Sequence, residues 1–135
     1  MADTTRRNNR ALALVSVASA VGSLDLSLMF VAYPSIRAHF AGESISVVSW
    51  VLTSYSIVAA ALLIPAGRLA DRVGRRTFFT LSIALFTLGS AGCAVAPTVP
   101  ILIAARVVAG CGGAMLTPTA LAIIMTIFPL ERRAW

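Results

Sequence analysis

The chain alternates between long apolar segments and short polar connections, and this pattern predicts its secondary structure. Asp25 is the single charge in Ala11–Tyr33, and no charge occurs in Ser44–Gly67, Thr77–Ala105 or Val107–Leu130. A helix needs about 20 mostly apolar residues to span a bilayer. We therefore predict four membrane-spanning helices, at about residues 11–33, 47–66, 78–96 and 101–128.

Prolines set several of the predicted helix boundaries, because a proline lacks the N–H group that a helix interior uses. Pro34 is expected to end the first helix, and Pro97 and Pro100 bracket a very short connection. The third and fourth helices are therefore predicted to form a tight antiparallel hairpin. Pro118 is expected to interrupt the fourth helix, and Pro129 to close it.

The composition favours an all-α integral membrane protein over a soluble domain. The chain has 135 residues, of which 59% are hydrophobic and 12% are charged, whereas soluble domains carry about 25% charged residues. The predicted helices and their connections fill residues 11–130, so no separate water-soluble domain fits beside them. Residues 1–10 are expected to form a tail and residues 131–135 a truncated end.

The basic residues are all arginines, and their positions predict an orientation. They concentrate in residues 1–10, 68–76 and 131–135, whereas the other two connections carry no net charge. We expect the protein to lie in the plasma membrane. The positive-inside rule then places the N-terminus and the other two arginine-rich regions in the cytoplasm. Topology thus explains the net charge of +6, and no nucleic-acid partner is expected. The apolar run continues past a cleavage-like Ala18–Ala20 box, so we expect the first helix to be retained.

The reactive side chains show no catalytic or metal-binding arrangement, so we do not expect an enzyme. Cys93 and Cys111 fall inside predicted helices, and we interpret them as buried small apolar residues. His39 is alone in an outer connection, and no cysteine–histidine cluster has the spacing of metal ligands. We predict neither a metal site nor a bound cofactor.

The connection between the second and third predicted helices combines glycine, aspartate and arginine. Gly67 and Gly74 permit sharp turns of the backbone. Asp71 is expected to pair with an arginine or to cap a helix start. The arginines around it are Arg68, Arg72, Arg75 and Arg76. A loop that only obeyed the positive-inside rule would need these arginines, but neither the aspartate nor the glycines.

Asp25 and Arg106 are charged residues inside predicted membrane helices, where an unpaired charge is costly. Both are therefore functional candidates. At a rise of about 1.5 Å per residue, Asp25 lies about 12 Å below the outer end of its helix, and Arg106 about 9 Å below that of the fourth. These depths agree within the reach of a side chain. The alternatives are a structural hydrogen bond for Asp25 and snorkelling to the membrane interface for Arg106.

Small residues follow Arg106 along the fourth predicted helix. They are Gly110, Gly112, Gly113 and Ala114. Small side chains let another helix approach closely, so we interpret these four as helix-packing residues, with Pro118 as a bend in the same helix. A direct ligand contact is the alternative for the glycines.

The connection after the second helix resembles a signature of the major facilitator superfamily, with the pattern G-x-L-a-D-r-x-G-r-r. The matching residues are Gly67, Leu69, Ala70, Asp71, Arg72, Gly74, Arg75 and Arg76. The resemblance implies that this loop packs against the other half of a transporter and helps to control its inside-closed state. The gating residues would be Gly67, Asp71, Arg72, Gly74, Arg75 and Arg76.

Two further segments resemble patterns of this superfamily, and the first of them is similar to a pattern of its fourteen-helix drug–proton antiporter branch. Leu24–Pro34 resembles l-D-x-T-x-x-n-x-A-l-P, although Phe30 replaces the usual asparagine and leaves the substrate class open. Arg106–Ala114 resembles R-x-x-q-G-x-g-a-a. The resemblance implies proton-coupled efflux of small lipophilic or cationic compounds, with protons as the coupling ion. It also makes the first and fourth helices neighbours, so that Asp25 would carry the proton or cationic substrate and Arg106 would tune it.

The resemblance covers the first four helices of a transporter that should have twelve or fourteen. We therefore expect an N-terminal fragment that forms the first part of a major facilitator N-terminal bundle. Its partners would be the lipid bilayer, a small-molecule substrate and the missing C-terminal helices of the same transporter. Two alternatives remain open, a small oligomeric four-helix exporter and a non-transporting membrane interaction protein.

Overall fold

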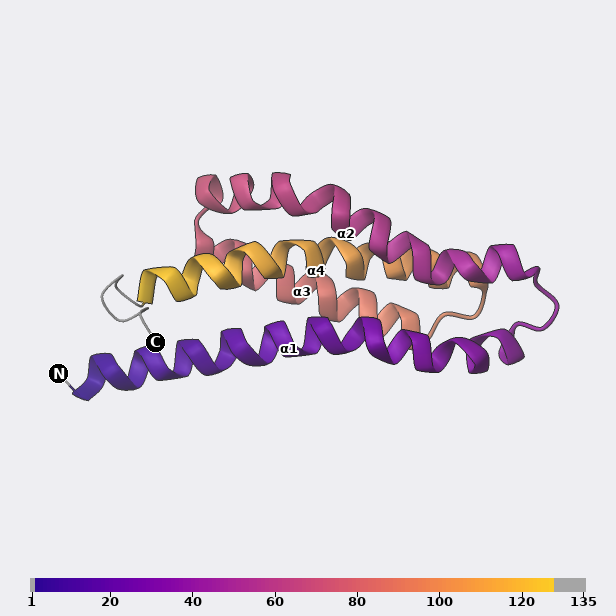
Figure 1. Cartoon of the computed structure of the whole chain (residues 1–135), viewed down its shortest axis with the longest axis horizontal. Coiled ribbons are helices and arrows are strands. Elements are labelled where there is room, and N and C mark those ends of the chain that lie inside the picture. Colours follow the sequence, from indigo (N-terminus) through magenta and orange to yellow (C-terminus); the bar gives the residue numbers. More distant parts are fainter. Residues whose placement is uncertain (1, 128–135) are drawn as a thin grey trace.

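The computed structural model describes the backbone of residues 2–127 and the side chains of residue 13, residues 16–25 and residues 27–122. This part of the chain consists of four α-helices joined by short connections (Figure 1). They are α1 (Ala2–His39), α2 (Ile45–Val73), α3 (Arg75–Ala94) and α4 (Val99–Ile127). Each contains a stretch that is long and apolar enough to cross a membrane. The predicted class, an all-helical multi-pass membrane protein, is confirmed.

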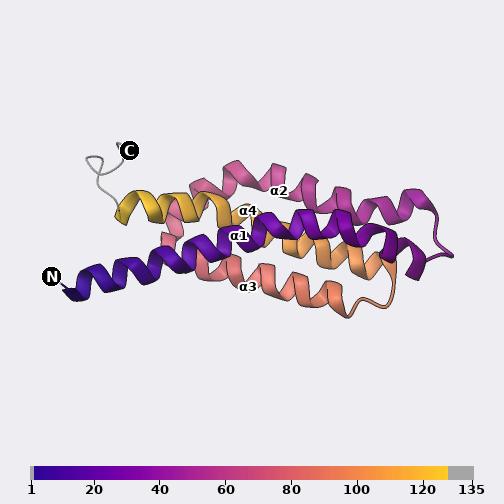
Figure 2. The same ribbon diagram turned by 60° about the horizontal axis from the view of Figure 1, so that its bottom comes forward.

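The four helices run alternately up and down. The N-terminal end of α1, the α2–α3 connection and the C-terminal end of α4 lie at one end of the bundle (Figures 1 and 2). The α1–α2 and α3–α4 connections lie at the opposite end. We call these the arginine-rich end and the opposite end. Helix α4 contacts all three other helices and packs most extensively against α3 and α2.

The core of the described bundle is arranged in clusters along its length. The cluster nearest the opposite end contains Val48, Val51, Val99 and Leu102. The middle cluster contains Tyr55, Phe86, Ala109 and Leu116. The cluster nearest the arginine-rich end contains Ala66, Ala70, Phe78 and Met115. Helix α1 adds several partly buried side chains to the first cluster and Ala18 to the second.

Two predicted proline boundaries are wrong. Helix α1 continues through Pro34 to His39, and α4 continues through Pro118. A proline removes only its own N–H from the hydrogen-bond ladder, so the following residues can resume the helix. Beyond Pro34, at the C-terminal end of α1, the Phe40 N–H still donates to the Ile36 carbonyl at 3.0 Å. Pro129 and residues 131–135 lie outside the described residues.

The connection between α2 and α3 is much shorter than predicted. Helix α2 begins at Ile45, where the Ser44 hydroxyl accepts from the Val47 N–H at 3.4 Å, and it continues through Gly67 to Val73. Only Gly74 separates α2 from α3. Its φ of +100° lies in the region that favours glycine, so the turn predicted at Gly74 is confirmed. The turn predicted at Gly67 is wrong, because that residue is helical.

Candidate functional site

An ion pair joins α1 and α4 inside the bundle. Nη1 of Arg106 donates to both carboxylate oxygens of Asp25, at 3.0 Å to Oδ2 and 3.2 Å to Oδ1. The Arg106 side chain is 3% exposed and the Asp25 side chain is 17% exposed. Both residues lie in membrane-spanning stretches, Ser16–His39 and Val99–Ala122. The proximity that we predicted from their matching depths and from the family resemblance is confirmed.

Tyr55 of α2 lies against the same guanidinium, a contact that we did not predict. The Cζ atom of Arg106 is 5.0 Å from the centre of the Tyr55 ring, within the range of a cation–π interaction. Cys93 of α3 lies beside the guanidinium as well. Among the described residues, Nε of Arg106 has no hydrogen-bond partner. The sequence offered one signal, a phenol inside a predicted membrane helix, where its polar end needs a partner.

Grooves open beside this ion pair, between α1, α2 and α4. One has a volume of about 350 Å³ and is lined by Met29, Phe30, Leu52, Thr53, Ser56 and Arg106. Another, of about 340 Å³, includes Ser19, Tyr55, Gly113 and Thr117 in its lining. Mostly apolar walls with a few hydroxyl groups are typical of sites for small lipophilic ligands.

The small residues predicted to pack helices lie where α4 is closest to its neighbours. A methyl group at Gly113 would lie 2.5 Å from the Tyr55 hydroxyl oxygen, and one at Gly110 would lie 3.1 Å from the Tyr55 carbonyl oxygen. A methyl group at Gly112 would lie 2.8 Å from Cα of Phe86 in α3. Ala114 is buried. The absence of larger side chains therefore lets α2 and α3 approach the backbone of α4.

At the arginine-rich end, Arg75 links α2, α3 and α4. Its Nη2 and Nε donate to Oδ1 of Asp71 at 3.3 and 3.4 Å, and its Nη1 donates to the Ala122 carbonyl at 3.1 Å. The Arg75 and Asp71 side chains are 45% and 66% exposed. The predicted pairing of Asp71 is confirmed. The capping alternative is wrong, because the N-cap of α3 is Gly74.

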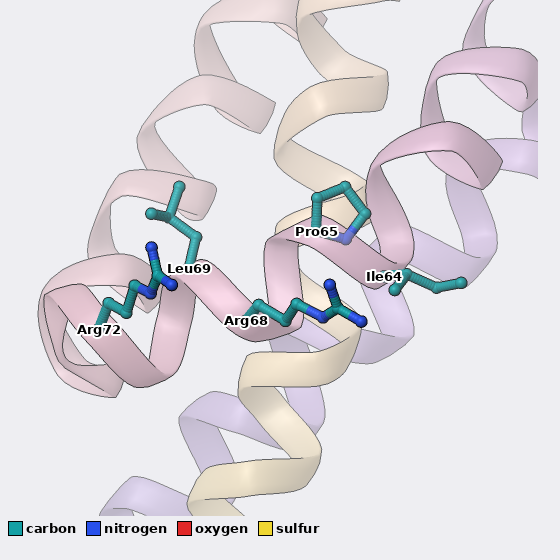
Figure 3. Close-up of a pocket in the computed structure, with 5 residues that line it drawn as sticks. All are labelled: Ile64, Pro65, Arg68, Leu69 and Arg72. Atoms are coloured by element: carbon teal, nitrogen blue, oxygen red, sulfur yellow. The ribbon is translucent and has the colours of Figure 1, made fainter.

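The other arginines of this region lie apart from the Asp71–Arg75 pair. Arg68 and Arg72 lie on one face of α2 (Figure 3), where they line a surface groove of about 410 Å³. The remaining lining residues are Ile64, Pro65 and Leu69. Arg76 is exposed in the first turn of α3. The structure thus brings together only part of the predicted gating set.

Gly67 and Pro118 meet where α2 crosses α4. A methyl group at Gly67 would lie 3.7 Å from Cβ of Pro118, so this glycine stands at a close helix crossing instead of at a turn. The two cysteines are only partly buried, which corrects the prediction of buried residues. Cys93 lines a groove of about 520 Å³ between α1, α3 and α4, and this groove keeps it from full burial.

Comparison with known proteins identifies the class of this bundle. Residues 15–134 match the Major Facilitator Superfamily, and the chain belongs to that family. The predicted family is therefore confirmed, and it is a family of membrane transporters, not of enzymes.

The relatives of this chain include proteins named for drug resistance. It is 44% identical over 108 residues to Multidrug resistance protein B homolog of Mycobacterium tuberculosis, covering 80% of this chain and 20% of that protein. It is 38% identical over 126 residues to Multidrug resistance protein Stp of the same organism, covering 90% and 23%. Methylenomycin A resistance protein of Streptomyces coelicolor is 34% identical over 113 residues, covering 84% and 24%. The chain spans about a fifth of the length of these relatives and aligns with their N-terminal portion.

Proposed function

We propose that these four helices supply the proton-coupling part of a drug exporter that exchanges an incoming proton for an outgoing small lipophilic or cationic compound. The observation that carries this proposal is the Asp25–Arg106 ion pair, which is buried between two membrane-spanning helices. An ionisable pair at such a position is expensive to maintain, and in transporters it is typical of ion and substrate pathways. The drug-resistance names of the relatives support the same direction of transport.

In the proposed mechanism, Asp25 takes up the proton and Arg106 controls how readily it does so. Nη1 of Arg106 lies 3.0 Å from Oδ2 of Asp25 and pairs with the ionised carboxylate. Protonation would weaken the ion pair and free Arg106 to reorient. The groove beside Arg106, with its apolar walls and the hydroxyl groups of Thr53 and Ser56, would receive the substrate.

The α2–α3 region would act as the gate at the cytoplasmic side. Gly74 allows the tight turn, and Arg75 ties this turn to α4 through Ala122. Arg68 and Arg72 form an exposed basic face on α2 that is available to the C-terminal helices of a complete transporter. The glycines of α4 would hold the bundle rigid enough to move as one body.

The decisive experiment replaces Asp25 in a full-length transporter that carries these four helices. Asp25→Asn should abolish ethidium efflux driven by a pH gradient while the protein stays folded in the membrane. Glu43→Gln removes the same charge from the exposed α1–α2 connection and should leave efflux unchanged, so it is the matched control. Normal proton-driven efflux by Asp25→Asn would refute the mechanism.

The chain alone provides a second test. Because alternating access needs two halves, we expect the purified 135-residue chain to show no pH-driven uptake in liposomes. Robust uptake would favour a small oligomeric exporter. If the full-length protein moved no compound and Asp25→Asn left its folding unchanged, a non-transporting membrane interaction protein would be favoured instead.

The proposed orientation places both termini and the arginine-rich end in the cytoplasm. In a Cys93→Ser, Cys111→Ser background, single cysteines at Ser46 and at Thr98 should react with an impermeant thiol reagent on intact cells. A cysteine at Thr4 should be protected until the cells are opened. Labelling of the cysteine at position Thr4 alone would contradict this orientation and would place the N-terminus outside the cell.

A further inference from the structure

We propose that Tyr55 is a positioning residue, whose aromatic ring holds the Arg106 guanidinium against Asp25. This inference rests on the proposed function, in which the Asp25–Arg106 pair controls proton uptake. The ring centre lies 5.0 Å from Cζ of Arg106, and Tyr55 is only 5% exposed. A cation over an aromatic face is attracted by the ring quadrupole, and this attraction increases when water is excluded.

The geometry of the ion pair shows why a second contact is needed. Arg106 reaches both oxygens of Asp25 through the single nitrogen Nη1. A guanidinium that binds a carboxylate through two parallel N–H groups is fixed in its plane, but one shared nitrogen leaves rotation about that contact free. Nε has no hydrogen-bond partner among the described residues, so it does not restrict the rotation. The Tyr55 ring provides the missing restraint.

The sequence of α4 makes room for this ring. Arg106, Gly110 and Gly113 are spaced by four and three residues, so they lie on one face of the helix. A methyl group at Gly113 would lie 2.5 Å from the Tyr55 hydroxyl oxygen, and one at Gly110 would lie 3.4 Å from its Cα. The two glycines therefore let Tyr55 pack against α4, so that its ring contacts the Arg106 guanidinium.

No second carboxylate competes with the ring among the described side chains. The titratable groups that face the guanidinium are Asp25 from α1, Tyr55 from α2 and Cys93 from α3. Glu43 lies in the α1–α2 connection, and Asp71 is paired with Arg75 at the arginine-rich end. Tyr55 is therefore the aromatic group that can orient Arg106.

The test measures how fast dicyclohexylcarbodiimide labels Asp25 in the purified 135-residue chain in liposomes, with mass spectrometry to locate the label. The reagent attacks the protonated acid, so labelling speeds up when the guanidinium leaves the carboxyl group. Tyr55→Leu should raise the rate about threefold to thirtyfold, the factor that corresponds to a cation–π contact. Tyr55→Phe keeps the ring and should leave the rate unchanged. Asp25→Asn should abolish the label at this position.

A fluorinated series separates ring electronics from packing. Phenylalanine with one, two or three ring fluorines at position 55 keeps the shape of the ring but progressively weakens its quadrupole, so the labelling rate should rise with each fluorine. Trp50→Leu, a change to an exposed aromatic of the same helix, is the control and should have no effect. The proposal would be overturned if the labelling rate did not change with the number of fluorines, or if Tyr55→Leu and Tyr55→Phe were labelled at equal rates. This readout does not depend on transport, so it stands even if Asp25→Asn retains proton coupling.

Discussion

Helices α4 and α1 each contain a membrane-spanning stretch, but the two stretches lie in very different environments. Half of the most apolar stretch of α4 is buried inside the bundle, whereas none of the described side chains in the corresponding stretch of α1 is buried. Helix α4 contacts the other three helices through small residues, while α1 exposes large side chains such as Val17, Leu28 and Val31. The ion pair joins these two unlike helices. One of its charges is therefore enclosed and the other is more accessible, which agrees with the proposed role of Asp25 as the group that takes up the proton.

The first prediction tests this asymmetry. Asp25→Leu leaves the permanently charged Arg106, which is 3% exposed, without its partner. We expect the free energy of unfolding to fall by about 3–5 kcal/mol, the usual cost of breaking a buried pair. Arg106→Leu should cost less, because a carboxyl group, unlike a guanidinium, can lose its charge. Unfolding of the purified chain in micelles, followed by circular dichroism, measures both values.

The double variant Asp25→Leu/Arg106→Leu is the control for this prediction. It removes both charges, so most of the stability lost in Asp25→Leu should return. If Arg106→Leu proved as costly as Asp25→Leu, the two charges of the pair would not differ as we infer. If the double variant recovered no stability, the loss in Asp25→Leu would not come from the unpaired Arg106.

The second prediction compares a glycine from each helix. A methyl group at Gly112 of α4 would lie 2.8 Å from backbone atoms of α3, whereas one at Gly22 of α1 would have no neighbour within 4 Å. Gly112→Ala should therefore lower the free energy of unfolding by about 1–3 kcal/mol. Gly22→Ala should be neutral or stabilising by up to about 1 kcal/mol, because alanine favours the helix. Equal effects in the same unfolding assay would contradict the packing contrast.

The fold was predictable because its main determinants are local. Four apolar segments of spanning length and a periodic distribution of arginines are visible in the sequence, and all four helices exist. The errors concern their ends. Pro34, Pro118 and Gly67 were interpreted by local conformational preference, but all three are accommodated within continuous helices. Packing against neighbouring helices overrides such preferences, and the sequence does not show which neighbour is present.

The candidate site was predictable in part. The Asp25–Arg106 contact was predictable from two charges at matching depths in apolar helices together with the family resemblance, which implies that the first and fourth helices are neighbours. Tyr55 was missed, because its role depends on the rotation of α2 about its own axis, which the sequence does not give. Gly89 of α3 was missed for the same reason. A methyl group there would overlap the backbone of Ala109, a contact between residues on two separate helices.

The third prediction concerns the attachment of α1 to α2 near the opposite end. The Tyr33 and Ser49 hydroxyl groups are 3.0 Å apart, and Ser49 also donates to the Ile45 carbonyl at 2.8 Å. Since Ser49 already donates within α2, Tyr33 is the donor of the link between the helices. Tyr33→Phe should lower the free energy of unfolding by about 0.6 kcal/mol, as for other hydrogen bonds between membrane helices. Thr53→Val removes a hydroxyl group that bonds only within α2 and is the control; a larger loss there would contradict the assignment.

The smallest predicted effect comes from the arginine-rich end, where α4 meets the α2–α3 turn. Arg75→Gln removes a cation that bonds Asp71 and the Ala122 carbonyl, but these side chains are about half exposed, so water and salt weaken the interaction. We expect a loss of about 0.5 kcal/mol in the free energy of unfolding that shrinks further in high salt. Arg72→Gln is the matched control, because Arg72 has no ion pair within the described part of the chain. A loss in Arg75→Gln that persists undiminished in high salt would mean that the carbonyl contact with α4, and not the exposed ion pair, stabilises this end. The contrast between α4 and α1 would then extend from the buried core to the surface of the bundle.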